Sequence, residues 1–170
     1  KKLAKEMGIS YEKFKIYDFP FEMDSSDCNC KGVFSSYFHF WDSERNLEIA
    51  KTYGFQSSDT PNEGTYRNFV GIDELLNRLH QYLKVLKFGY GRASDHASED
   101  IRNGRIDRDR GIELVLKYDS QPIGQYIKSK ICNFLNYKEG EFELILEKYR
   151  NMEIWKKNNE GEWFIPRNFN

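Results

Sequence analysis

Hydrophobic residues recur every three or four positions along most of the chain, a spacing typical of helices that bury one side. The longest stripe predicts one extended amphipathic helix, and it consists of Ile72, Leu75, Leu76, Leu79, Leu83 and Leu86. Shorter stripes predict further helices, separated by short turns, over 43–54, 93–101, 107–116, 123–131 and 142–149. Ala93, Ala97 and Ile101 repeat every four residues, and the two small side chains predict a close contact between helices.

Local signals predict where these helices begin and end. Ser43, Ser94 and Asp107 are residue types that cap helix N-termini, and Gly54 and Gly104 are expected to end helices. The helix that follows the last cap is predicted to bury Ile112, Val115 and Leu116. Five or six short helices with short turns imply a compact helical layer.

The first 42 residues lack these stripes and indicate mixed α/β structure. Segment 33–41, Val-Phe-Ser-Ser-Tyr-Phe-His-Phe-Trp, is rich in β-favouring residues and predicts a strand buried on both faces. A weaker strand is predicted at 14–17, and a helix is expected to end at Gly8. The sequence therefore predicts a mainly α protein, with a helical region over 43–170 and the last one or two strands of an α/β domain within 1–42.

Composition excludes several classes of protein. Aromatic residues make up 16% of the chain, too many for a disordered protein. The 26 Lys+Arg nearly balance the 27 Asp+Glu, which argues against nucleic-acid or membrane-surface partners. No apolar run approaches the about 20 residues of a membrane span and no signal peptide is visible, so we expect a cytoplasmic location. Because residue 1 is Lys, the chain can be a processed product or the tail of a longer protein.

Common catalytic signatures are absent from the sequence. It contains no Walker phosphate loop, no dinucleotide fingerprint that opens a helix and no nucleophile elbow. The Gly-Tyr-Gly at 89–91 follows a predicted helix, which favours a turn between helices over a phosphate loop. Cys28 and Cys30 form a Cys-x-Cys pair whose nearest further zinc ligands are His39 and Cys132, so two ordinary thiols are favoured and no metal is expected.

A polar cluster at the start of a predicted helix is the best candidate for ligand binding. It contains Arg92, Asp95 and His96, and a helix N-terminus with an arginine beside it could hold a carboxylate or phosphate. The alternative is that Ser94 and Asp95 only cap the helix while Arg92 pairs with Glu99 on its surface. The residues themselves leave both interpretations open.

Longer strings of the sequence add a resemblance. They are Glu-Gly-Thr-Tyr-Arg-Asn-Phe at 63–69, Lys-Phe-Gly-Tyr-Gly-Arg-Ala-Ser-Asp-His-Ala-Ser-Glu-Asp-Ile-Arg-Asn-Gly-Arg at 87–105, Arg-Gly-Ile-Glu-Leu-Val with Lys-Tyr-Asp at 110–119, and Ile-Trp-Lys at 154–156. In this order and spacing they resemble the C-terminal half of the N-acetyl sugar amidotransferase family. The resemblance covers nearly the whole chain, and its long central motif is specific.

The resemblance implies a function in bacterial surface-glycan synthesis, including O-antigen lipopolysaccharide and flagellin glycans. Members of this family, within the PP-loop ATP pyrophosphatase superfamily with its HUP-like α/β domain, are thought to convert the N-acetyl group of a nucleotide-linked sugar to an acetamidino group. ATP with Mg activates the amide oxygen, and ammonia from a partner glutaminase replaces it. The family's Ser-Gly-Gly-x-Asp-Ser phosphate loop and cysteine pair precede the matched strings and are not among these 170 residues. We therefore expect residues 1–42 to be the remnant of the ATP-binding domain and this chain alone to be inactive.

The matched motifs also suggest site residues. The predicted substrate-binding residues are Thr65, Tyr66, Asn68, Arg92, Asp95 and His96. Of these, Arg92, Asp95 and His96 are expected to bind substrate phosphates or orient the reactive amide, and Glu99 is expected to support Arg92. The competing hypothesis is a non-catalytic helical module that docks onto an ATP-binding partner or a glutaminase, or forms a homo-oligomer through the leucine stripe.

Overall fold

The computed structural model describes residues 5–6, 8–15 and 32–166, and the chain divides into two compact units, Lys1–Trp41 and Asp42–Asn170. Cys28 and Cys30, and most of the helix predicted before Gly8, lie outside the described residues. The sequence placed its boundary one residue later, between 42 and 43. The assignment of the first part to an ATP-binding domain stays a prediction.

The first unit contains short elements where the sequence predicted strands. Helix α2 spans Tyr11–Phe14, with Lys15 as its C-cap. Residues 14 and 15 of the weak strand predicted at 14–17 therefore form the end of a helix, and residues 16 and 17 lie outside the described residues. The strand predicted at 33–41 is wrong, because this segment forms a 3-10 turn, η2, at Ser35–Tyr37. Its side chains are not buried either: Phe34 is 78% exposed and Phe38 is 73% exposed. A strand needs a neighbour to take its backbone hydrogen bonds, and no described segment pairs with this one.

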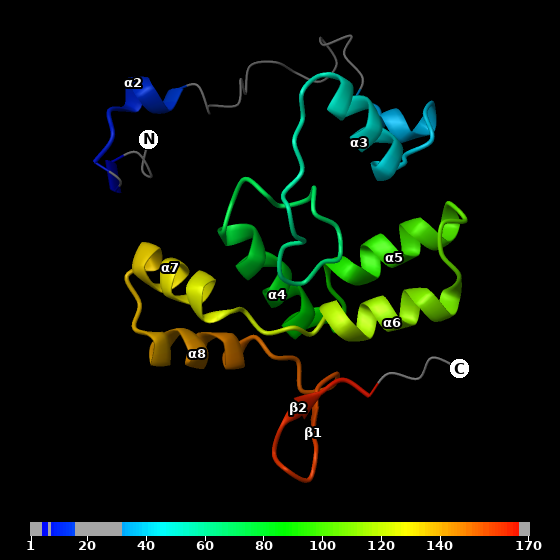
Figure 1. Ribbon diagram of the computed structural model, residues 1–170. Coiled ribbons are helices and arrows are strands. Elements are labelled where there is room, and N and C mark those ends of the chain that lie inside the picture. The colour runs from blue at the N-terminus through cyan, green and yellow to red at the C-terminus, as the bar shows by residue number, and fades with distance from the viewer. Residues whose placement is uncertain (1–4, 7, 16–31, 167–170) are drawn as a thin grey trace. The chain divides into compact units, whose positions relative to one another are not determined.

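Helices are the main secondary structure of the second unit, which confirms the predicted fold class. Its elements are α3 (Ser43–Thr52), α4 (Leu76–Phe88), α5 (Arg92–Arg102), α6 (Arg108–Tyr118), α7 (Gln125–Leu135), α8 (Glu139–Lys148), β1 (Lys156–Lys157) and β2 (Trp163–Phe164). The two strands are antiparallel, with Lys156 opposite Phe164. Figure 1 shows α5 beside α6 and α7 beside α8, with α4 between the two pairs. Each helix in the described residues is too short or too polar to cross a bilayer.

The main hydrophobic core forms where α4 meets α7, α8 and the C-terminal segment. It contains Val85, Leu86, Ile123, Ile131, Cys132, Phe142, Leu146 and Trp155. The predicted leucine stripe is confirmed over its second half, but Ile72 and Leu75 lie exposed before α4 begins. The Asn62 side chain donates to the carbonyls of Val70 and Gly71, which holds this segment as a turn instead of a first helical turn.

Helices α5 and α6 pack closely, as the small residues predicted. Ala93 and Ala97 are buried, and a Cβ added to Gly111 of α6 would lie 2.9 Å from the Ile101 side chain. The buried face of α6 differs from the predicted one, because Leu116 is 60% exposed. The predicted burial of Val115 is confirmed, and the other buried residues of α6 are Gly111 and Leu114.

Only one of the three predicted caps holds. Asp107 caps α6 by accepting from the backbone N–H of Arg110. The cap of α3 is Asp42 and not Ser43, since the carboxylate accepts from two backbone N–H groups of the first turn. The N-cap of α5 is Gly91, and Ser94 lies inside the helix. Both serines instead bond to acidic side chains from distant parts of the chain.

Candidate functional site

The glycine turn at 89–91 is structural. Gly89 ends α4 with a left-handed backbone, φ 78°, and a Cβ at Gly91 would lie 2.6 Å from Val85 and 2.7 Å from Asp119. The turn between helices, favoured from the sequence, is therefore confirmed. The carboxylate of Asp119 accepts from the N–H groups of Gly91 (2.8 Å) and Ser94 (3.2 Å) and from the Ser94 hydroxyl (2.8 Å). The N-terminus of α5 thus already holds an anion, which belongs to the protein.

A buried ion network joins loop 63–69 to α5. Arg67, only 3% exposed, donates to Glu99 (2.9 Å) and to Asp100 (2.6 Å). The Tyr66 hydroxyl donates to the other oxygen of Asp100 (2.6 Å), and Ser43 of α3 donates to Glu99 from its backbone (2.6 Å) and its hydroxyl (3.0 Å). Arg105 contacts both Asp100 and Asp42, so the network also holds the start of α3.

The network shifts the acidities of its members. Burial raises the pKa of the Tyr66 hydroxyl, and its hydrogen bond to Asp100 raises it further, so the phenol stays protonated. Burial acts to raise the pKa of Glu99, but the hydrogen bonds from Ser43 and Arg67 lower it overall, and Glu99 stays ionised. The sequence analysis missed Arg67. A single cation in an otherwise uncharged stretch, 64–69, could have suggested a partner for the adjacent acids of α5.

His96 and Thr65, both predicted site residues, are brought together. The Thr65 hydroxyl oxygen lies 2.9 Å from His96 Nδ1, and it also accepts from the backbone N–H of Arg67 (3.1 Å). This favours the tautomer in which Thr65 donates to Nδ1. Burial, with the positive charges of Arg67 and Arg92, lowers the pKa of His96 to about 4. His96 would therefore meet a ligand at neutral pH as an uncharged group.

Three further candidates have structural contacts. The Asn68 side chain donates to the backbone carbonyl of Ser58 (2.7 Å), and the backbone carbonyl of Asn68 accepts from the backbone N–H of Ser58 (2.8 Å). Asp95 pairs with Lys84 of α4 at 2.6 Å. The described contacts of Glu99 go to Arg67 and Ser43, and not to Arg92 as expected. The functional roles predicted for these three residues stay predictions, and the contacts just described give each of them a structural role as well.

A second buried arginine shapes a pocket between loop 62–71 and α4. Arg78, 7% exposed, donates to Glu63 (3.3 Å) and to the carbonyls of Gln121 and Pro122. Glu63 also accepts from the N–H of Gly124 (2.8 Å). The motif residue Glu63 therefore joins α4 to the segment before α7. Because the charge of Arg78 is already paired, it shapes the pocket more than it attracts a ligand.

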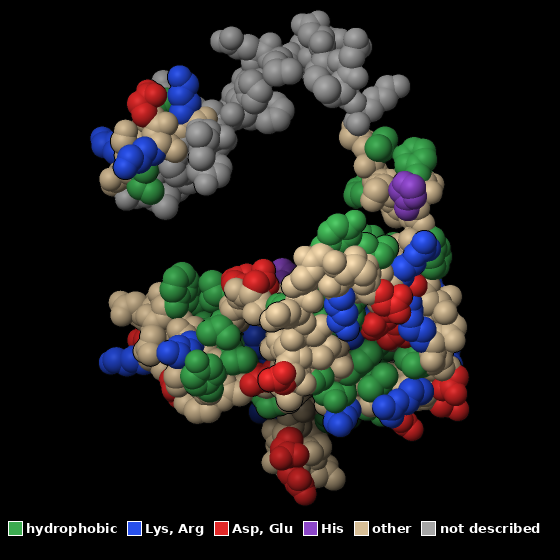
Figure 2. All heavy atoms as spheres, turned by 45° about the horizontal axis from the view of Figure 1, so that its top comes forward, with side chains coloured by type: hydrophobic (Ala, Val, Ile, Leu, Met, Phe, Trp, Pro, Cys, Tyr) green, Lys and Arg blue, Asp and Glu red, His purple; other side chains and the backbone are tan. Residues whose placement is uncertain are grey.

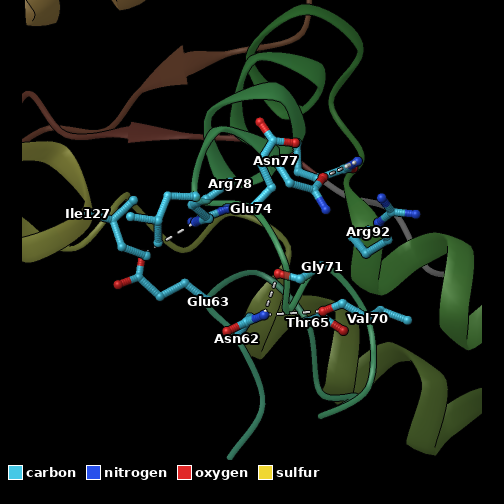
Figure 3. A pocket seen from close by; sticks show the side chains of 12 residues that line it. Asn62, Glu63, Thr65, Val70, Gly71, Glu74, Asn77, Arg78, Arg92 and Ile127 are labelled. Carbon is cyan, nitrogen blue, oxygen red and sulfur yellow. Dashed lines mark hydrogen bonds and ion pairs between the residues drawn. The ribbon is translucent and has the colours of Figure 1, made fainter. Parts of the chain in front are cut away.

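The pocket beside Arg78 and Glu63 has a volume of about 50 Å³, which is room for a few water molecules or for one small polar substituent. Figure 3 shows Glu63 and Ile127 on one side of it and Arg92, from α5, on the other. Its wall also includes Thr65, which joins it to His96, and Gln81 of α4. The Gln81 side-chain oxygen is buried and has no hydrogen-bond partner among the described residues. An unpaired acceptor in a polar pocket suits a ligand with an N–H group.

Arg92 differs from the polar residues that follow it in α5. Within the described part of the chain its guanidinium makes no hydrogen bond or ion pair, although it lines the pocket. The following polar side chains with a distant partner are Ser94, Asp95, His96, Glu99 and Asp100. Arg92 is therefore the pocket's available cation, able to bind phosphate or an amide oxygen.

The glycine turn at 89–91 leaves no space for a bound phosphate. The glycine turn at 89–91 is filled by Val85 and Asp119, and the nearby N–H groups are already bonded. No group of three His, Cys, Asp or Glu side chains within these residues could hold a metal ion. Figure 2 shows basic and acidic side chains interspersed on the face in view, with no broad surface of one sign.

Comparison with known proteins supplies a family. Residues 63–168, more than half of the chain, match the family described as "LPS biosynthesis protein WbpG-like, C-terminal domain". The match begins at Glu63 and includes Arg67, Glu99 and Asp100 of the ion network and every pocket-lining residue except Asn62. No curated protein matches the chain.

Proposed function

The chain belongs to the family of WbpG-like C-terminal domains of LPS biosynthesis proteins, and we propose that it forms the sugar-binding part of an N-acetyl sugar amidotransferase. The reaction proposed is the conversion of the acetamido group of a nucleotide-linked sugar to an acetamidino group. ATP, when bound, would activate the amide oxygen, and ammonia from a partner glutaminase would replace it. The resemblance assigns the ATP phosphates to a phosphate loop that is not among these 170 residues, and the role proposed for this chain is to bind and orient the sugar.

The observation that carries this proposal is that Arg92 and the unpaired side-chain oxygen of Gln81 line the same small pocket. An acetamido group has one N–H donor and one carbonyl acceptor. The unpaired oxygen of Gln81 can accept from the N–H, and Arg92 can donate to the carbonyl or to a substrate phosphate. Thr65, held by His96, supplies a third polar group in the same wall.

Binding of UDP-N-acetylglucosamine to the 170-residue chain, measured by calorimetry, tests the proposal. Arg92→Ala should raise the dissociation constant about 10-fold or more, the usual worth of a charge-assisted contact. Arg110→Ala is the matched control, because Arg110 is an exposed arginine paired with Glu113 on α6. UDP-glucose, which lacks the acetamido group, should bind more weakly than UDP-N-acetylglucosamine. Equal affinity of Arg92→Ala and the unchanged chain would refute the proposal.

A second candidate function is an interaction module, and the exposed aromatic segment of the first unit favours it. Phe34, Tyr37, Phe38 and Phe40 are 73–83% exposed, which is unusual for large apolar side chains that lie so close together. Size-exclusion chromatography with light scattering separates self-association from a monomer. If the chain self-associates and a variant with all four of these aromatic residues replaced by serine is monomeric, this segment is the interface.

A further inference from the structure

A second hollow lies beside the C-terminal end of α4. Its volume is about 270 Å³, and it is lined by His80, Leu83, Lys84, Lys87, Phe88 and Tyr90. It therefore combines two aromatic rings with two ammonium groups around one opening. Gln81, which lines the first pocket, and Lys84, which lines this hollow, are three residues apart on α4 and therefore lie near each other on the helix surface.

The two rings are available for stacking. Phe88 is 60% exposed and Tyr90 is 47% exposed, while the buried side of this part of α4 is formed by Val85 and Leu86. The left-handed backbone of Gly89 ends the helix between the two aromatic residues. Their ring centroids lie 6.4 Å apart with the planes tilted by 41°. Exposed aromatic faces next to basic side chains are typical of surfaces that stack a nucleobase.

The two lysines are held where a phosphate would need them. The Lys84 ammonium lies 4.5 Å from the centre of the Tyr90 ring and 2.6 Å from a carboxylate oxygen of Asp95. The Lys87 ammonium lies 4.5 Å from the centre of the Tyr149 ring. The two ammonium groups of Lys84 and Lys87 face one carboxylate, that of Asp95, and the remaining positive charge attracts an anion. A purely apolar ligand would not use this excess.

We propose that this hollow binds the nucleoside diphosphate portion of the substrate, with the base against Phe88 and Tyr90 and the phosphates at Lys84 and Lys87. The assignment rests on the proposed function, because the sugar end then extends along α4 toward Arg92 and Gln81. The hollow and the pocket together give the two ends of one nucleotide-linked sugar separate places beside α4. The smaller volume of the pocket suits the acetamido substituent, and the larger volume of the hollow suits the base.

Titration of the 170-residue chain with UDP and with inorganic pyrophosphate tests this inference. Phe88→Leu and Tyr90→Leu should each raise the dissociation constant for UDP about 10-fold, the loss expected when one stacking contact is removed. Neither should change the affinity for pyrophosphate, which has no base. Lys84→Met should weaken both ligands. Phe134→Leu, at an aromatic residue of α7 that is 73% exposed, should change nothing.

The outcomes separate this inference from the proposed function. If UDP does not bind, or binds equally to the chain and both aromatic variants, the hollow is not a nucleotide site. If UDP-N-acetylglucosamine then still depends on Arg92, the proposed function stands without the hollow. If UDP binding depends on both rings while Arg92 and the acetamido group have no effect, the hollow is supported and the proposed sugar pocket is refuted.

Discussion

Mild acid should destabilise this protein through His96 before carboxylates with ordinary pKa values are protonated. In the folded chain His96 is 5% exposed, lies beside two arginines and has a pKa of about 4. In the unfolded chain the imidazole returns to its ordinary pKa of about 6.5. The unfolded state therefore binds the extra proton between these two values. The stability that His96 contributes is fully present above pH 6.5 and is lost as the pH falls toward 4.

The size of the effect follows from the two pKa values. Each unit of difference corresponds to about 1.4 kcal/mol, so the full loss for His96 is about 3 kcal/mol. About 2 kcal/mol of it is lost between pH 6.5 and pH 5, where carboxylates with ordinary pKa values remain ionised. With a typical urea dependence of about 2 kcal/mol per M, the unfolding midpoint should fall by about 1 M over this range.

Urea unfolding at several pH values between 5 and 7, followed by circular dichroism, measures the slope directly. His96→Asn keeps a polar side chain beside Thr65 but cannot titrate, so its midpoint should vary much less with pH. His80→Asn is the control, because His80 is an exposed histidine on α4 and its removal should leave the slope unchanged. The same pH slope in His96→Asn and in the unchanged chain would show that His96 is not the neutral, buried group described above.

Three further substitutions test the network and the turn. Arg67→Ala should lower the free energy of unfolding by about 3–5 kcal/mol in urea, because two buried carboxylates lose their cation, and a loss below about 1 kcal/mol would contradict a buried network. Gly91→Ala should cost about 1–3 kcal/mol and lower the melting temperature, since its Cβ would meet Asp119, and an unchanged melting temperature would show that the turn has room. Asp95→Asn should change stability by less than about 1 kcal/mol, because its ion pair is partly exposed, but should tighten pyrophosphate binding by freeing Lys84. Weaker pyrophosphate binding in that variant would instead show that Asp95 holds Lys84 in position for the phosphate.

The helices were predictable because their signal is local. The stripe that includes Leu79, Leu83 and Leu86 repeats within one segment, and the small residues Ala93 and Ala97 indicated a close packing partner without identifying it. The strand at 33–41 failed for the complementary reason. Its composition favours β-structure, but a strand depends on neighbours that a local pattern does not contain, and the described residues provide none.

The candidate site was only partly predictable because its contacts join distant residues. The sequence pointed to the loop and helix start that contribute Thr65 and Arg92 to the pocket, but it could not show that Arg67 would take Glu99 as its partner, 32 residues away. Nor could it show that Asp119 would fill the N-terminus of α5. In each case a residue type that suits ligand binding also suits an internal contact. Only the three-dimensional arrangement distinguishes the two uses.

The distribution of charge explains why Arg92 should matter more than one hydrogen bond would suggest. In the buried network, the guanidinium groups of Arg67 and Arg105 face four carboxylates, those of Asp42, Glu44, Glu99 and Asp100. This negative excess lies on α5 and the segments packed on it, near the pocket, and it opposes the approach of an anionic ligand. Arg92 is the pocket cation whose charge is not used by an internal contact in the described chain. Removing Arg92 takes away a hydrogen-bond donor and also the positive charge that offsets the negative excess. Arg92→Ala should therefore weaken the binding of UDP-N-acetylglucosamine much more than the binding of neutral N-acetylglucosamine. Equal losses for the two ligands would mean that Arg92 contacts only the amide.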